Sequence, residues 1–186
     1  QTLKGKGTVL LGPSTALTIN GLLSPGNSPG LLTYDGGGTV TLSGTTLMEV
    51  WGTIRGANPG YDAIDLINGT DLIFGGILNL DFNQTFANST SFNLFTPDGT
   101  SNLAGNFSSI TMVGSAYTDL MFTNNAGFWT TNTGTANTSM TFNSATGTLS
   151  IIVVPEPGTL ALAGFGIAAA TWAFRRHKHK AGRSLS

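Results

Sequence analysis

Short apolar runs that alternate with polar residues recur between residues 17 and 151 and constrain the fold more than any other feature. In Val40-Thr41-Leu42 and Leu78-Asn79-Leu80-Asp81-Phe82, every second side chain is apolar. This period of two is typical of a β-strand with one buried face. Gly, Asn, Asp, Pro or Ser residues bound the runs, and no stretch before Pro155 keeps a helical period. The chain before Pro155 is therefore expected to be all-β.

The spacing of these runs fits two architectures. Intervals of about 8 to 12 residues are typical of a β-sandwich and also of the coils of a β-solenoid. Residues 21–33 read G-L-L-S-P-G-N-S-P-G-L-L-T. This segment resembles a repeat element of autotransporter-type passenger domains, a resemblance that implies a right-handed parallel β-helix. Pro25 and Pro29 are expected in a turn between coils, with Gly26 and Gly30 supplying positive φ angles.

Together these features predict an ectodomain at residues 1–152. A short right-handed parallel β-helix is expected over residues 1–82, where the repeats are visible. It is expected to pass into a β-sandwich-like capping region over residues 83–152, whose phenylalanines close the open end. A β-sandwich for the whole ectodomain remains the alternative.

The C-terminal segment has a different composition. Val153-Val154-Pro155-Glu156-Pro157-Gly158 precedes an uncharged apolar run from Thr159 to Phe174, and a basic tail follows at 175–183. At about 1.5 Å per residue the run gives a helix of about 24 Å, short of a hydrocarbon core of about 30 Å. One transmembrane helix is nevertheless expected at 158–174, because the run is apolar all round and abuts dense positive charge, which stays cytoplasmic. Arg175, Arg176, Lys178 and Lys180 are the residues expected to determine this topology.

Motif, apolar run and basic tail together resemble the PEP-CTERM sorting domain of exported proteins of Gram-negative bacteria, over residues 153–180. The resemblance implies that Pro155, Glu156 and Pro157 are read by an exosortase. It also implies a transient stay in the inner membrane, followed by delivery to the cell surface or the extracellular matrix. Each proline biases the residue before it toward an extended conformation, which suits a recognition motif.

Charge argues against nucleic-acid binding by the ectodomain. Residues 1–152 carry three basic residues against eight acidic ones, although the whole chain has a net charge of −1. Neutralisation of phosphates supplies most of the affinity for nucleic acids. The basic residues are Lys4, Lys6 and Arg55.

Few residues in the ectodomain offer catalytic chemistry. The chain has no cysteine, and its two histidines, His177 and His179, lie in the basic tail. No histidine-dependent nucleophile is therefore expected, nor any metal or cofactor. A non-enzymatic surface or matrix protein, associated with exopolysaccharide or biofilm, is the favoured interpretation. The alternative is a secreted β-helical carbohydrate-active enzyme that uses clustered carboxylates, with Asp62, Asp65, Asp71 and Asp81 as candidates.

Two further expectations concern the ectodomain. Trp51 and Trp129 are interpreted as core or edge residues and not as sugar-stacking platforms. The chain begins Gln1-Thr2-Leu3-Lys4, without an initiator methionine or an apolar signal segment. The sequence is expected to be either processed or a fragment, and the repeat-like start favours a fragment.

Overall fold

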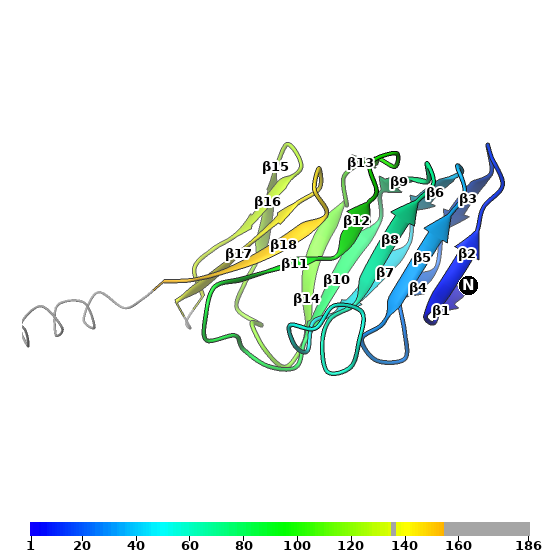
Figure 1. Ribbon diagram of the computed structural model, residues 1–186. Coiled ribbons are helices and arrows are strands. Elements are labelled where there is room, and N and C mark those ends of the chain that lie inside the picture. Colours follow the sequence, from blue (N-terminus) through cyan, green and yellow to red (C-terminus); the bar gives the residue numbers. More distant parts are fainter. Residues whose placement is uncertain (135–136, 155–186) are drawn as a thin grey trace, which may run out of the picture. The chain divides into compact units, whose positions relative to one another are not determined.

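The computed structural model describes residues 1–134 and 137–154, and every regular element among them is a β-strand (Figure 1). Residues Gln1–Val153 form one compact unit. No helix in these ranges is long and apolar enough to span a membrane. The transmembrane helix expected at 158–174 and the basic tail at 175–183 lie outside the described residues.

Three parallel sheets form most of this unit. Sheet 1 contains β1 (Thr2–Lys4), β4 (Leu22–Ser24), β7 (Thr45–Glu49), β10 (Ile77–Phe82) and β14 (Ser109–Gly114). Sheet 2 contains β2 (Gly7–Leu10), β5 (Leu31–Asp35), β8 (Ala63–Ile67) and β12 (Phe95–Pro97). Sheet 3 contains β3 (Ala16–Ile19), β6 (Thr39–Leu42), β9 (Asp71–Phe74) and β13 (Leu103–Gly105).

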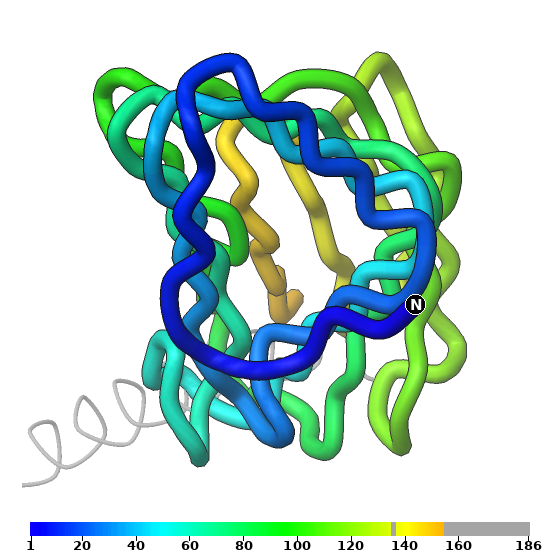
Figure 2. The backbone as a smooth tube through the Cα atoms, turned by 90° about the vertical axis from the view of Figure 1, so that its right-hand side faces the viewer, coloured from blue at the N-terminus to red at the C-terminus, as the bar shows by residue number. Residues whose placement is uncertain are grey.

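The chain visits the three sheets in turn and so winds into a coil. Each strand pairs in parallel with its counterpart one coil later, as Leu22 of β4 does with Thr45 of β7. Figure 2 views the coil from its N-terminal end and shows the chain turning clockwise as it recedes, which is a right-handed winding. The parallel pairing confirms the expected β-helix over the antiparallel sandwich that the spacing also allowed.

Alternation in the sequence explains the core. Leu78, Leu80 and Phe82 of β10 point into the coil and are fully buried, whereas Asn79 and Asp81 between them are only partly buried. Parallel register stacks the inward residues of successive coils, as in the pairing of Val40 with Leu72 and of Leu72 with Leu103. Each coil therefore buries its apolar side chains against its neighbours.

The coil continues through residues in which the sequence shows no repeat period. β12 and β13 pair in parallel with β8 and β9, and β14 pairs in parallel with β10 as far as Gly114. β12 and β13 are only three residues long. Their alternation is too short to recognise, and the ladder to the preceding coil specifies them instead.

An antiparallel cap sheet packs on the C-terminal end of the coil. Its strand order is β11 (Thr90–Asn93), β18 (Thr148–Val153), β17 (Thr138–Asn143), β16 (Phe128–Thr131) and β15 (Phe122–Asn125). Figure 2 shows β17 and β18 behind the opening of the coil. Phe142 of β17 contacts Phe74, Phe95 and Phe107, with ring centroids 5.9 to 6.2 Å apart. The phenylalanines thus join the cap to the coil within one core, and Trp129 is buried as expected.

Candidate ligand cleft and sorting site

The longest connections leave the coil at the corner between sheets 1 and 2. This corner carries residues 25–30 after β4, residues 50–62 after β7, and residues 83–89, which connect β10 to β11 of the cap sheet. In Figure 1 these loops project from the same edge of the coil. Binding residues concentrate on loops held by a rigid scaffold, so a binding site is expected at this corner.

Residues 25–30 form the expected turn between coils, but its two glycines serve different needs. Gly26 has a φ of 138°, which a residue with a side chain rarely adopts. Gly30 was expected to have a positive φ as well, and this is wrong. A Cβ at Gly30 would lie 2.5 Å from the Pro25 carbonyl oxygen, so close backbone contact requires the glycine there.

A buried carboxylate fixes this turn to the neighbouring coil. Asp62 is fully buried, and its Oδ1 accepts a hydrogen bond from the Gly30 amide at 2.7 Å. Its Oδ2 accepts one from the Glu49 amide at 2.9 Å. The Asp62 amide donates back to the Glu49 carbonyl oxygen at 2.8 Å. Asp62 thereby ties together the turn at 25–30, the end of β7 and the start of β8.

Burial dominates the titration of this carboxylate. Desolvation raises the pKa of Asp62 to about 7, although the amides of Glu49 and Gly30 oppose the shift. The pKa of Glu49 is also raised, by burial and then by the charge of Asp81, while Lys4 lowers it. Glu49 Oε2 is buried without a hydrogen-bond partner among the described residues. Both carboxyl groups therefore favour protonation more strongly when folded than when unfolded.

This shift predicts a pH dependence of stability. Between pH 4 and pH 7 the folded state holds a proton on Asp62 that the unfolded state has lost, so stability decreases as the pH rises. We expect a slope of at most about 1.4 kcal/mol per pH unit. In Asp62→Asn this contribution to the slope is expected to vanish. Urea unfolding at several pH values measures both slopes, and identical slopes would contradict the assignment.

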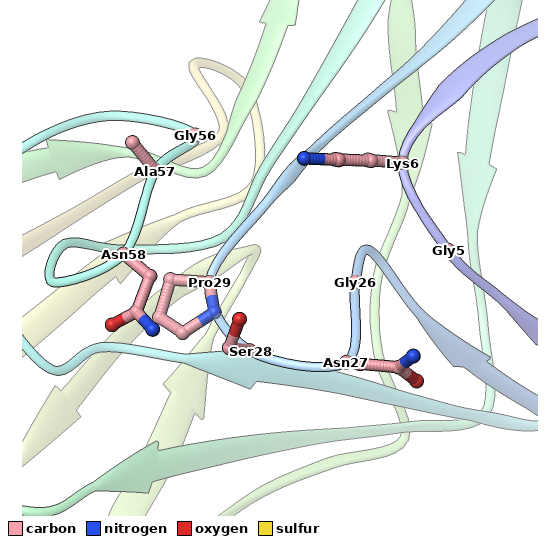
Figure 3. Close-up of a pocket in the computed structure, with 9 residues that line it drawn as sticks. All are labelled: Gly5, Lys6, Gly26, Asn27, Ser28, Pro29, Gly56, Ala57 and Asn58. Atoms are coloured by element: carbon pink, nitrogen blue, oxygen red, sulfur yellow. The ribbon is translucent and has the colours of Figure 1, made fainter.

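The turn at 25–30 forms one wall of an open cleft of about 530 Å³. The cleft is lined by Gly5, Lys6, Gly26, Asn27, Ser28, Pro29, Gly56, Ala57 and Asn58. These residues come from three successive coils. Figure 3 shows the Lys6 side chain extended toward the loop of Gly56 and Ala57, and Ser28 on the neighbouring turn. Lys6 is the one charged residue of this lining.

Arg55 holds the loop at 50–62 against sheet 2. Its guanidinium group pairs with Asp65, at 2.5 Å between Nη2 and Oδ1, and Nη2 also donates to Thr96 Oγ1 at 2.8 Å. Nε donates to the Asn93 carbonyl oxygen at 3.3 Å. The loop that supplies Gly56, Ala57 and Asn58 to the cleft is thus fixed on both sides, by Arg55 and by Asp62.

The four candidate catalytic aspartates do not gather at one place. Asp65, Asp71 and Asp81 lie on sheets 2, 3 and 1, and Asp62 is enclosed at the corner. Asp65 pairs with Arg55, and Asp71 Oδ1 accepts hydrogen bonds from the backbone and side-chain amides of Asn102. Asp62, Asp65 and Asp71 thus support loops and turns. The described residues also contain no group of three or more acidic, histidine or cysteine side chains suited to a metal ion.

The sequence alone did not point to Lys6, Ser28 and Asn58 as neighbours. The only signal is the segment at residues 21–33, whose Pro25 and Pro29 predict a structural turn between coils. The residues lie in different coils, and the coils differ in length because the loop at 50–62 and the segment at 83–94, which includes β11, are inserted between sheets 1 and 2. Their meeting therefore depends on the register between strands, which the repeats do not specify.

The expected sorting residues follow the cap directly. Val153 is the last residue of β18 and pairs with Thr138 of β17, and its amide donates to Ser89 Oγ at 3.0 Å. Val154 is the last described residue. The expected motif (Pro155, Glu156, Pro157) and the expected topology residues (Arg175, Arg176, Lys178, Lys180) lie outside the described part of the chain.

Comparison with known proteins identifies this terminal segment. A family model described as the PEP-CTERM protein-sorting motif matches residues 153–176. No curated protein and no solved structure matches the chain. The likeness of residues 21–33 to autotransporter repeats is therefore unsupported. The chain carries a PEP-CTERM protein-sorting motif, which implies exosortase-dependent sorting of an exported protein to the cell envelope or surface of a Gram-negative bacterium.

Proposed function

We propose that this chain is a non-enzymatic surface or matrix protein that associates with extracellular polysaccharide after sorting. The observation that carries the proposal is the position of the motif. Its match begins at Val153, where β18 ends. The whole coil with its cap therefore precedes the sorting signal and is its cargo. In this proposal the protein stays in the inner membrane only while its terminal segment is still attached.

The surface of the folded unit supports a passive role. It has few charges, no cysteine and no histidine before the basic tail, and Asp62, Asp65 and Asp71 support turns and loops. A rigid β-helix with polar loops along one corner offers a long surface to a hydrated polymer. Binding to such a polymer needs hydrogen bonds and shape, and it does not need a reactive group.

Fractionation of the extracellular matrix tests this function. We expect most of the exported protein to purify with the polysaccharide and to be freed when the polysaccharide is digested. The purified full chain should leave the viscosity of that polysaccharide unchanged. Recovery of the protein only as free material in the medium would contradict the association, and a falling viscosity would contradict the non-enzymatic role.

A further inference from the structure

The geometry points to the corner cleft as a binding site for an acidic sugar, with a uronic acid carboxylate on the Lys6 ammonium group and sugar hydroxyls on Ser28 and Asn58. This assignment rests on the proposed function, because it names the surface and the class of polysaccharide. It adds a site and a ligand chemistry that the sorting motif does not specify.

Charge supplies the first argument. Lys6 is exposed at the cleft and forms no ion pair with any described residue, whereas Arg55 is paired with Asp65. No carboxylate lines the cleft. Asp62 lies behind the turn at 25–30, and both of its oxygens accept backbone amides. An unpaired cation in a polar, anion-free concavity favours an anionic group, and a hydrogen bond to a charged group is stronger than a neutral one.

Unused hydrogen-bonding groups supply the second argument. The Ser28 and Asn58 side chains make no hydrogen bond with the described part of the chain. A different corner, between sheets 2 and 3, behaves otherwise. There Asp98 accepts hydrogen bonds from the amides of Asn68, Thr100 and Ser101 at 2.8 to 2.9 Å. These bonds lower the pKa of Asp98 well below its usual range. At that corner the Asp98 carboxylate is satisfied by the protein's own amides, whereas the side chains of Ser28 and Asn58 remain available to a ligand.

The size and lining of the cleft favour an acidic sugar over a small inorganic anion. Its volume of about 530 Å³ falls within the usual range of roughly 300–1,000 Å³ for small-molecule sites and exceeds the needs of a single inorganic ion. Gly5 and Gly56 are partly exposed and present backbone to a ligand that carries many hydroxyls. No aromatic ring lines the cleft, so a neutral sugar would lack a stacking partner. A uronic acid residue combines the carboxylate and the hydroxyls that this lining can bind.

The cleft is already fixed in shape. Asp62 holds the turn at Gly30, and Arg55 holds the opposite loop against Asp65 and Thr96. A Cβ at Gly60 would lie 1.9 Å from the Ile54 carbonyl oxygen, which shows how closely this loop packs on itself. Ligand binding therefore requires little ordering of the loops, which removes one cost of association.

Calorimetric titration of the full chain in mild detergent tests the site. The probe is a tetramer of galacturonic acid, and its fully methyl-esterified form is the control ligand because each carboxylate becomes a neutral methyl ester while the hydroxyls are kept. We expect Lys6→Gln to weaken binding of the acidic tetramer by about 10-fold or more. Ser28→Ala and Asn58→Ala are each expected to weaken it by about 2- to 10-fold. Lys4 is also exposed but lies outside the lining, and Lys4→Gln should change binding by less than about 2-fold.

Several results would overturn the assignment. They are no binding of the acidic tetramer at millimolar concentration, equal binding of the esterified tetramer, or equal losses in the Lys4→Gln and Lys6→Gln variants. Circular dichroism confirms that each variant is folded. If Lys6→Gln still purifies with the native matrix as the wild type does, the cleft assignment fails while the proposed function stands. If the wild-type protein does not purify with the matrix, the proposed function itself fails.

Discussion

Replacing Pro155, Glu156 and Pro157 with three alanines is expected to reduce release of the protein from the membrane by at least about 10-fold. Each proline restricts its own φ angle and biases the residue before it toward an extended conformation, which suits reading of the motif by an enzyme along the backbone. Glu156 adds the one negative charge of the segment that follows Asp119. Alanines remove the restriction and the charge together. Immunoblots of membrane and extracellular fractions measure the change.

The matched control for this variant is a second triple alanine substitution, at Ser184, Leu185 and Ser186. It lies beyond the basic tail and should leave release at the wild-type level. Normal release of the Pro155–Glu156–Pro157 variant would show that the triplet is incidental to sorting. Equal retention of both variants would show that the chain end as a whole, and not the triplet, is recognised.

Asp62→Ala is expected to cause the largest loss of stability among substitutions in the ectodomain. It leaves the amides of Gly30 and Glu49 buried without their acceptors. Each orphaned donor costs about 1–3 kcal/mol, so the free energy of unfolding should fall by about 2–6 kcal/mol. Because Asp62 joins two coils, the turn that lines the cleft should also become disordered. Urea unfolding near neutral pH measures the loss.

Asp35→Ala is the control for that experiment. The partly exposed Asp35 carboxylate, at the end of β5, accepts a hydrogen bond from Asn68 Nδ2 at 2.7 Å. Its loss should cost no more than about 1 kcal/mol. A similar small effect for Asp62→Ala would mean that water replaces the carboxylate, and it would contradict the role of Asp62 as the anchor of the corner.

The sequence predicted local structure well where the alternation was long. Leu78 to Phe82 lies within β10, with its apolar residues inward, and Val40 to Leu42 lies within β6. The resemblance carried by residues 21–33 led to the correct coil, although its link to autotransporters is unsupported. The sorting motif was also recognisable because its signal is linear and requires no tertiary contact.

Features that depend on contacts between coils could not be predicted. Asp62 binds Gly30 and Glu49, which precede it by 32 and 13 residues. β12 and β13 are too short to show a period, and their pairing with β8 and β9 specifies them. The positive φ angle predicted for Gly30 is wrong. A position can require glycine because of a positive φ angle or because another backbone segment lies close by, and the sequence does not distinguish these two causes. The cleft could not be predicted either, because its lining residues come from three coils and meet only through contacts between coils.

If the terminal segment sorts the ectodomain as its cargo, the segment should be missing from the delivered protein. Mass spectrometry of the protein isolated from the cell surface or the extracellular matrix tests this most directly. We predict a mature C-terminus at or near Pro155 to Pro157, without the apolar run at 159–174 and without Arg175 and the residues after it. Surface protein that still ends at Ser186 would contradict this expectation.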